Sequence, residues 1–292
     1  MDVGIGLPTT LSGVGGSALI DWAIEGERAG LHTLATLDRL VYDNYESLTA
    51  LAAAAAVTEH VRLATAILIA PLRTNTALLA KQVATVDRIS GGRLTLGLAV
   101  GARPDDFTAS GAPRLGRGAR LTAQIEEMRR IWAGERRGFA GAIGPRPTRE
   151  GGPEILLGGH SSGAIARVAA TGSAWISGSG GIGAFQQGAQ AVRRAWRDGG
   201  RAGAPRLLGL TYFAVGGNAE RDANIYLRDY YGFAPPYAQM VLNGAAIGEQ
   251  GVVDTVRAYR DAGCDELILA PCSADLAQVR LLSEALTRAG TA

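Results

Sequence analysis

Residues 61–111 read VRLATAILIAPLRTNTALLAKQVATVDRISGGRLTLGLAVGARPDDFTASG. A short apolar run, 61–69, is followed by a loop. Apolar side chains then recur at a spacing that keeps one helical face towards a core: Leu78, Leu79, Val83, Val86 and Ile89. Gly91 and Gly92 are placed to end this helix, because glycine readily takes the left-handed conformation. A second apolar run, 93–100, completes a strand–helix–strand unit, which indicates parallel strands in an α/β domain.

The rest of the chain repeats this alternation. Strands are expected at 2–7, 33–37, 61–69, 93–100, 154–157, 174–177, 207–215 and 266–270. Helices are expected at 17–29, with Ser17 as the cap, and at 46–59, 78–89, 121–132, 162–171, 184–197, 252–262 and 276–288. A further helical region is expected between the strand at 207–215 and residue 243. Eight strands, each followed by helix, favour a closed (β/α)8 barrel over an open Rossmann sheet, which stays as the alternative. We expect a single domain over 1–292, with 134–152 as a long surface loop.

Composition narrows the class of protein. The chain has 292 residues, 47% of them hydrophobic, which is enough for one large core. It shows no apolar run long enough for a membrane span and no signal peptide, so a cytoplasmic protein is expected. Its 29 cations include a single lysine, Lys81, and the arginines are scattered, which gives no indication of nucleic-acid binding. Cys264 and Cys272 form neither a disulfide framework nor a metal-binding spacing.

The stretch that decides the fold also carries a resemblance. LLAKQVATVDRISGGRLTLGLAVG (78–101), running into DDFTASG (105–111), resembles the signature of the luciferase-like family of flavin- and deazaflavin-dependent oxidoreductases. The resemblance covers most of the chain and implies a single (β/α)8 TIM barrel that binds FMN or coenzyme F420. It also implies a small-molecule substrate and a homodimer.

Barrel polarity selects the candidate catalytic residues, because the chemistry of such barrels lies on the loops after the strands. His32 and His60 precede strands and are expected to be structural. His160 follows the strand at 154–157 and can face a ligand or cap the next helix. Asp38 and Arg39 follow the strand at 33–37, where we expect them to line the pocket rather than to form a surface ion pair.

The resemblance gives these two positions roles. In deazaflavin-using members the position of Asp38 borders the cofactor, and the next position is commonly a catalytic histidine. Here that position is Arg39. Arginine remains protonated, so it can stabilise an anion or orient a substrate but is a poor proton shuttle. The catalytic candidates are therefore Asp38, Arg39 and His160.

Further positions match the cofactor-contacting strand ends of the family. The family carries a non-proline cis peptide that presses against the flavin ring, and the matching bond here is Ala66–Ile67; from the residues alone this is a plain buried strand. Gly101, Ala102 and Arg103 match the next strand exit, where a glycine lets the backbone approach a ring closely. Gly158 and Gly159 end the strand before His160 and complete the expected cofactor wall.

The turn Gly178-Ser-Gly-Gly-Ile-Gly183 is a literal G-x-G-x-x-G, and Asp198 lies twenty residues past Gly178. A dinucleotide site is rejected, because Asp198 ends a helix rather than the next strand. Backbone N–H groups at a helix N-terminus still bind phosphate. We therefore expect the cofactor's phosphate region at Ser177, Gly178, Ser179, Gly180 and Gly181, with a flexible turn as the alternative. Some deazaflavin enzymes place a lysine here, and this chain has none.

For two further features the sequence allows either a packing role or a functional one. The aromatic residues after the strand at 207–215 can pack in a core or roof a pocket for a flat or apolar substrate: Tyr226, Tyr230, Tyr231, Phe233 and Tyr237. Cys272, after the last strand, is expected to be a small buried hydrophobe rather than a nucleophile.

The leading functional prediction is an oxidoreductase that transfers a hydride between coenzyme F420 and a small organic substrate. The first alternative is a monooxygenase that uses reduced FMN and oxygen, with a separate flavin reductase as partner. A phosphate-binding isomerase or lyase without flavin, and a catalytically inactive barrel subunit, are further alternatives. No metal site is expected.

Overall fold

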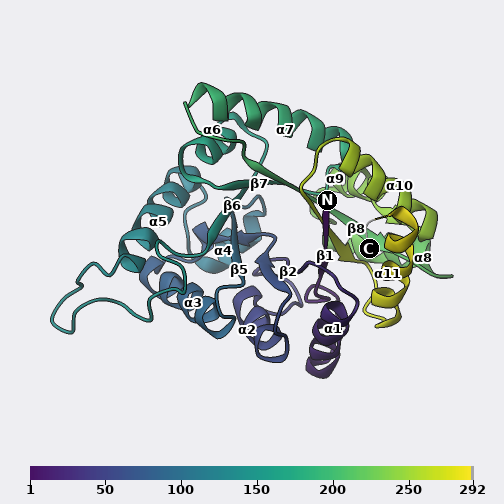
Figure 1. The fold of residues 1–292 in the computed structure, drawn as a ribbon, viewed down its shortest axis with the longest axis horizontal. Helices are drawn as coiled ribbons and strands as arrows, with labels where there is room; N and C mark the ends of the chain where they lie inside the picture. Colours follow the sequence, from purple (N-terminus) through teal and green to yellow (C-terminus); the bar gives the residue numbers. More distant parts are fainter. Residues whose placement is uncertain (291–292) are drawn as a thin grey trace.

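The computed structural model describes residues 1–290 and shows a closed barrel of parallel strands surrounded by helices (Figure 1). The last two residues of the predicted domain lie outside the described part. The strands are β1 (Asp2–Gly6), β2 (Thr33–Thr36), β3 (Arg62–Thr65), β4 (Leu68–Ile69), β5 (Leu94–Ala99), β6 (Glu154–Gly158), β7 (Ala174–Ser177), β8 (Arg206–Ala214), β9 (Ala246–Ile247) and β10 (Glu266–Pro271).

The barrel itself consists of β1, β2, β3, β5, β6, β7, β8 and β10, each paired in parallel with its neighbour. It closes where β10 pairs with β8, from Glu266 opposite Leu208 to Pro271 opposite Phe213. The short strands β4 and β9 pair in parallel with the carboxyl-terminal residues of β5 and β8. The predicted (β/α)8 barrel is therefore confirmed, and the open-sheet alternative is wrong.

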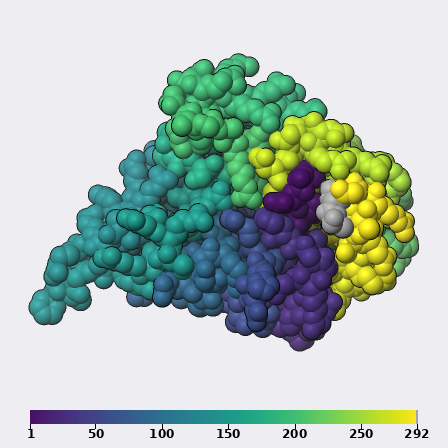
Figure 2. Space-filling model, viewed as in Figure 1, coloured from purple at the N-terminus to yellow at the C-terminus, as the bar shows by residue number. Residues whose placement is uncertain are grey.

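Helices cover the outside of the barrel. They are α1 (Gly16–Arg28), α2 (Ser47–Val57), α3 (Thr76–Ile89), α4 (Pro104–Ser110), α5 (Arg117–Trp132), α6 (Ser162–Thr171), α7 (Gly181–Asp198), α8 (Ala219–Tyr230), α9 (Pro235–Asn243), α10 (Gly248–Asp261) and α11 (Ala277–Ala289), with a 3-10 turn, η1 (Ala70–Leu72). In Figure 2 the N-terminal segment lies beside α11, and the residues between α5 and β6 project from the body as the expected surface loop.

Several helix ends follow from local chemistry. The side chains of Glu46, Asn75 and Ser161 accept the first free N–H groups of α2, α3 and α6. Gly91 and Gly92 end α3 with positive φ angles, as predicted. The predicted cap at Ser17 is wrong, because α1 begins one residue earlier and Gly15 at its N-cap offers no side chain.

Two separate apolar layers hold the barrel. Small and branched side chains fill its interior: Ala35, Ala64, Ala66, Leu156, Ala174, Ile176, Leu208, Leu210 and Ile268. A larger layer lies between the strands and the helices, and its largest fully buried side chains include Trp22, Trp175 and Phe185. The interior layer stops short of the carboxyl end of the barrel, where it forms the floor of a cavity that contains Ala66, Ile176 and Leu210.

Candidate active site

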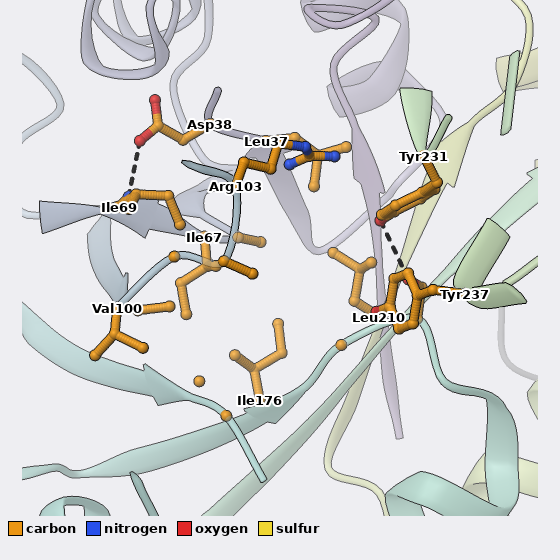
Figure 3. A pocket seen from close by; sticks show the side chains of 18 of the residues that line it. Leu37, Asp38, Ile67, Ile69, Val100, Arg103, Ile176, Leu210, Tyr231 and Tyr237 are labelled. Atoms are coloured by element: carbon orange, nitrogen blue, oxygen red, sulfur yellow. Dashed lines mark hydrogen bonds between the residues drawn. The ribbon is translucent and has the colours of Figure 1, made fainter. Parts of the chain in front are cut away.

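A cavity of about 570 Å³ opens at the carboxyl ends of the strands, the end at which barrel enzymes place their chemistry (Figure 3). Most of the predicted site residues line it: Asp38, Ala66, Ile67, Gly101, Ala102, Gly158, Gly159, His160, Ser177, Gly178 and Ser179. Arg39, Gly180 and Gly181 do not. The strand ends therefore bring together side chains that are far apart in the sequence.

One wall of the cavity is apolar and has no room for larger side chains. The bond between Ala66 and Ile67 is cis, as the family resemblance implied, and both residues face the cavity beside Val100 and Ile176. A Cβ added at Gly158 would lie 2.7 Å from Cδ1 of Ile67. Glycine at this strand end therefore lets the Ile67 side chain occupy its place in the wall.

Gly101 shapes the same wall from the end of β5. Its φ is +74°, and a Cβ there would lie 2.5 Å from Cγ2 of Ile69. Any other residue would meet both a backbone penalty and a steric one. The chain stays at the cavity after β5, and Ala102 and Arg103 follow Gly101 in its lining.

Asp38 lies at the cavity but its carboxylate is already bound. It accepts hydrogen bonds from Nη1 and Nη2 of Arg73, at 2.7 and 3.0 Å, and from the N–H of Ile69, at 2.7 Å. Ser47 adds a longer contact, at 3.3 Å. Burial lowers the pKa of Arg73, but the Asp38 and Glu46 carboxylates outweigh it and raise that pKa, so the guanidinium stays charged. Asp38 thus holds the chain after the cis bond in place.

Arg39 does not line this cavity, although together with Asp38 it lines a neighbouring hollow. Its guanidinium lies 4.5 Å from the ring centre of Tyr42, donates to the carbonyl of Tyr230 at 3.1 Å and lies 3.5 Å from a carboxylate oxygen of Asp105. Asp38 and Arg73 line the same hollow. The arginine that lines the main cavity is Arg103, which lies between β5 and α4.

His160 lines the cavity beside β7. Its Nε2 lies 3.3 Å from Oγ of Ser177, and its ring meets the Trp175 ring edge-on, with centres 5.4 Å apart. Desolvation lowers the pKa of His160 below its ordinary value, so the ring is neutral at neutral pH. A neutral imidazole can accept a proton from a bound molecule and return it.

The glycine turn joins β7 to α7. Gly178 and Ser179 line the cavity, and α7 begins at Gly181, whose φ is +76°. The first turn of α7, with its free N–H groups, therefore begins two residues after Ser179 in the chain. A Cβ added at Gly178 would meet no atom within 4 Å, so the space in front of this backbone is open.

Aromatic residues after β8 form a roof over the cavity, one of the two outcomes that the sequence left open. Tyr230, Tyr231, Phe233 and Tyr237 line it. The hydroxyl of Tyr231 lies 2.9 Å from that of Tyr212 and 3.3 Å from Oγ of Ser179, which ties the roof to the glycine turn. Burial raises the pKa of Tyr231, so it remains a neutral phenol.

Tyr226 belongs to the core instead. Its hydroxyl contacts Oγ1 of Thr10 at 2.6 Å, and the residue is buried. Cys272 is also buried, and desolvation raises the pKa of its thiol, which agrees with the expectation of a small apolar residue. The described residues 1–290 contain no group of side chains that could hold a metal ion.

The remaining histidines lie where barrel polarity predicted. His32 is at the opposite end of the barrel, between carboxylates of Asp2 and Glu266 at 3.3 and 3.4 Å. His60 is exposed beside Glu59. No helix among residues 1–290 has the length and apolar character needed to cross a membrane.

Comparison with known proteins now gives the family. The sequence model described as luciferase-like monooxygenase matches residues 1–266. The chain belongs to this family. An uncharacterised protein of Mycobacterium tuberculosis is 27% identical over 168 residues, which cover 55% of this chain and 59% of that protein.

Two similar proteins have named activities. The FMNH(2)-dependent dimethylsulfone monooxygenase of Pseudomonas putida is 25% identical over 225 residues, covering 72% of this chain and 61% of the relative. The F420-dependent glucose-6-phosphate dehydrogenase of Amycolatopsis mediterranei is 27% identical over 146 residues, covering 47% of this chain and 44% of the relative. The matched region thus spans between 44% and 61% of the length of these three proteins.

Solved structures show the same fold over nearly the whole chain. The monooxygenase RslO1 of Streptomyces bottropensis has a TM-score of 0.76 at 22% identity, with 99% of both chains covered. An F420-dependent secondary alcohol dehydrogenase, solved with an F420–acetone adduct, has a TM-score of 0.81 at 15% identity, again with 99% of both chains covered. The luciferase-like barrel is therefore the fold of this protein.

Proposed function

We propose that the protein is an oxidoreductase that binds coenzyme F420 in this cavity and transfers a hydride between it and a small organic substrate. The observation that carries the proposal is the cavity surface that runs from the apolar wall at Ala66–Ile67 to Gly178 and Ser179, in the turn that precedes α7. Such a surface suits a flat ring at one end and a phosphate group at the other.

The residues present fit both parts of the cofactor. The wall of Ala66, Ile67 and Ile176 is apolar, and Gly101 and Gly158 offer no side chain that would keep a ring away. At the other end, open space lies in front of Gly178. Backbone N–H groups and the hydroxyl of Ser179 are the donors available to a phosphate there.

The cofactor supplies two-electron chemistry when bound, so the chain has to bind, orient and exclude water. Asp38 contributes by fixing Ile69, two residues after the cis bond, through the hydrogen bond to its N–H. The aromatic roof covers the cavity from the side of α8 and α9. His160 is the neutral base in the site and would hold the substrate's proton at Nε2.

A second candidate is a monooxygenase that uses reduced FMN, delivered by a separate reductase. The observation in its favour is the turn at 178–183, which contains no lysine or arginine. Hydroxyl and backbone donors are enough for the single phosphate of FMN, whereas F420 carries a longer anionic tail. The relatives named above include users of both cofactors.

Titration of the purified protein with each cofactor tests the proposal. F420 and FMN would be added anaerobically, in oxidised and reduced forms, and binding followed by fluorescence quenching and calorimetry. Tighter binding of F420 supports the hydride-transfer proposal, and tighter binding of reduced FMN supports the second candidate. If neither ring binds, both proposals are wrong.

A further inference from the structure

Arg103 brings an unpaired positive charge to the cavity. Its Nη2 donates to the carbonyl of Tyr230 at 3.0 Å, while its buried Nε has no hydrogen-bond partner. Among residues 1–290 no carboxylate oxygen lies within 4.0 Å of its guanidinium. A partly buried guanidinium without an anion is unusual, because burying a charge is costly unless it is paired.

Aromatic rings hold this guanidinium in place. Its Cζ lies 4.6 Å from the ring centres of both Tyr230 and Phe233, and 5.5 Å from that of Tyr231. Cation–π contacts stabilise the cation without using its in-plane N–H donors. The charge is therefore kept in position while donors remain for a ligand.

No other group on the cavity wall compensates the charge. Asp38 is neutralised by the bidentate contact with Arg73. Desolvation lowers the pKa of His160 and raises that of Tyr230, so both are neutral at pH 7. The cavity therefore presents one net positive charge, on the side that Figure 3 shows across from Ile176.

Arg39 offers a comparison within the same chain. It also donates to the carbonyl of Tyr230, at 3.1 Å, and its Cζ lies 5.5 Å from the Tyr230 ring centre. However, it has a carboxylate partner in Asp105 and does not line the cavity. Both arginines hold the end of α8, but only Arg103 faces the ligand space with its charge unpaired.

We propose that Arg103 binds the carboxylate of the substrate, and that the substrate is an apolar or aromatic carboxylic acid; this rests on the proposed function of the cavity. Guanidinium and carboxylate match in charge and in planar geometry. Leu37, Leu210 and Tyr237 supply apolar surface around the ligand space. The acid group thus fixes one end of the substrate, while the remainder lies in the cavity next to the apolar wall.

Calorimetry with benzoate as the probe tests the assignment, with benzamide as the uncharged probe of similar shape. Wild-type protein should bind benzoate more tightly than benzamide. Arg103→Met should lower this ratio of affinities by at least about tenfold, the scale of one charge-assisted hydrogen bond. Arg103→Lys should restore part of it. Arg39→Met, which loses the matching contacts with Tyr230, should keep the preference. If both methionine variants lose the preference for benzoate, the proposal is overturned, because the loss would then come from a disturbed end of α8 and not from the Arg103 charge.

A second arm separates the substrate from the cofactor. Arg103→Met should discriminate FMN from riboflavin as well as wild type does, because the phosphate is assigned to the glycine turn. If this variant loses that discrimination instead, Arg103 serves the cofactor's phosphate and the carboxylate assignment is wrong. If wild type binds neither flavin nor F420 but Arg103 still selects benzoate, the cofactor proposal fails and the anion assignment stands.

Discussion

Asp38 and Arg73 form a bidentate pair between the end of β2 and the turn before α3, with N–O distances of 2.7 and 3.0 Å. The Asp38 side chain is 4% exposed and that of Arg73 22%. The same carboxylate also accepts the N–H of Ile69. One buried ion pair therefore fixes the backbone that forms the apolar wall of the cavity.

Removing one partner of this pair should destabilise the protein strongly. Asp38→Asn leaves the Arg73 charge without its closest counterion, and we expect the free energy of unfolding to fall by about 3 kcal/mol. Urea denaturation measures it. Adding Arg73→Met to Asp38→Asn should recover part of the loss. Glu46→Gln, which removes the more exposed carboxylate near Arg73, is the matched control and should cost much less. No recovery in the double variant would contradict this account.

The sequence predicted that Asp38 and Arg39 both belong to the site, whereas the main cavity is lined by Asp38 alone of the two. Both residues follow β2, which ends at Thr36, but Arg39 donates to the carbonyl of Tyr230 and pairs with Asp105, so that only Asp38 lines the main cavity. The partner of Asp38, Arg73, is 35 residues away in the sequence. No local pattern connects these positions; the parallel pairing of β2 with β3 and of β4 with β5 brings them together.

The proton-accepting role of His160 predicts a particular pH profile. Its pKa is lowered, so protonation should slow turnover only at pH values below the ordinary histidine pKa of about 6.5. His160→Gln should lower turnover at pH 7 by about 10²-fold and remove this acidic limb. Steady-state rates between pH 5 and 8 measure both, with His60→Gln as the exposed control. An unchanged acidic limb in His160→Gln would assign the titration to another group.

Just before the cis bond, the side chain of Thr65 makes the hydrogen bonds that join β3 to β5. Oγ1 of Thr65 donates to the carbonyl of Gly97 at 2.7 Å and accepts from the N–H of the same residue at 2.8 Å. Thr65→Val keeps the shape but leaves both buried groups unpaired, which should cost about 2–4 kcal/mol of unfolding free energy. Thr65→Ser should cost far less. Equal stabilities of the two variants in urea would exclude this role.

Helical periodicity identified α3 but not which of its apolar residues are buried. Leu79, Val83 and Val86 are buried, whereas Leu78 and Ile89 are 51% exposed. The predicted face was too wide, because the spacing fixes a face only to within a residue on either side. The sequence analysis also missed α4, since a helix of seven residues is too short for a hydrophobic period to show.

At the far end of the barrel, His32 should make stability depend on pH. A hydrogen bond with Glu266 raises the His32 pKa above its unfolded value of about 6.5. The stabilisation is therefore fully present below pH 6.5 and is lost as the pH rises through the folded-state pKa. His32→Gln should be less stable than wild type at pH 6 and approach it at pH 9, measured by urea unfolding. His60→Gln should match wild type at both; a constant deficit in His32→Gln would contradict the linkage.

The glycine turn gives the most direct test of the phosphate site. Gly180 is a poor position for it, because a Cβ there would lie 2.9 Å from Cβ of Ala184 and disturb α7 itself. Gly178 lines the cavity and has no atom within 4 Å of an added Cβ, so Gly178→Asp should fold normally. Its carboxylate would face the phosphate and weaken FMN binding by at least about tenfold, through repulsion in a partly dry site.

Riboflavin, which lacks the phosphate, should bind to Gly178→Asp nearly as well as to wild type. Gly163→Asp, at an equally open glycine in the first turn of α6 and outside the cavity lining, is the matched control and should bind both ligands normally. Calorimetry measures the affinity of wild type, Gly178→Asp and Gly163→Asp for each ligand. If Gly178→Asp loses equal affinity for FMN and riboflavin, the phosphate binds elsewhere.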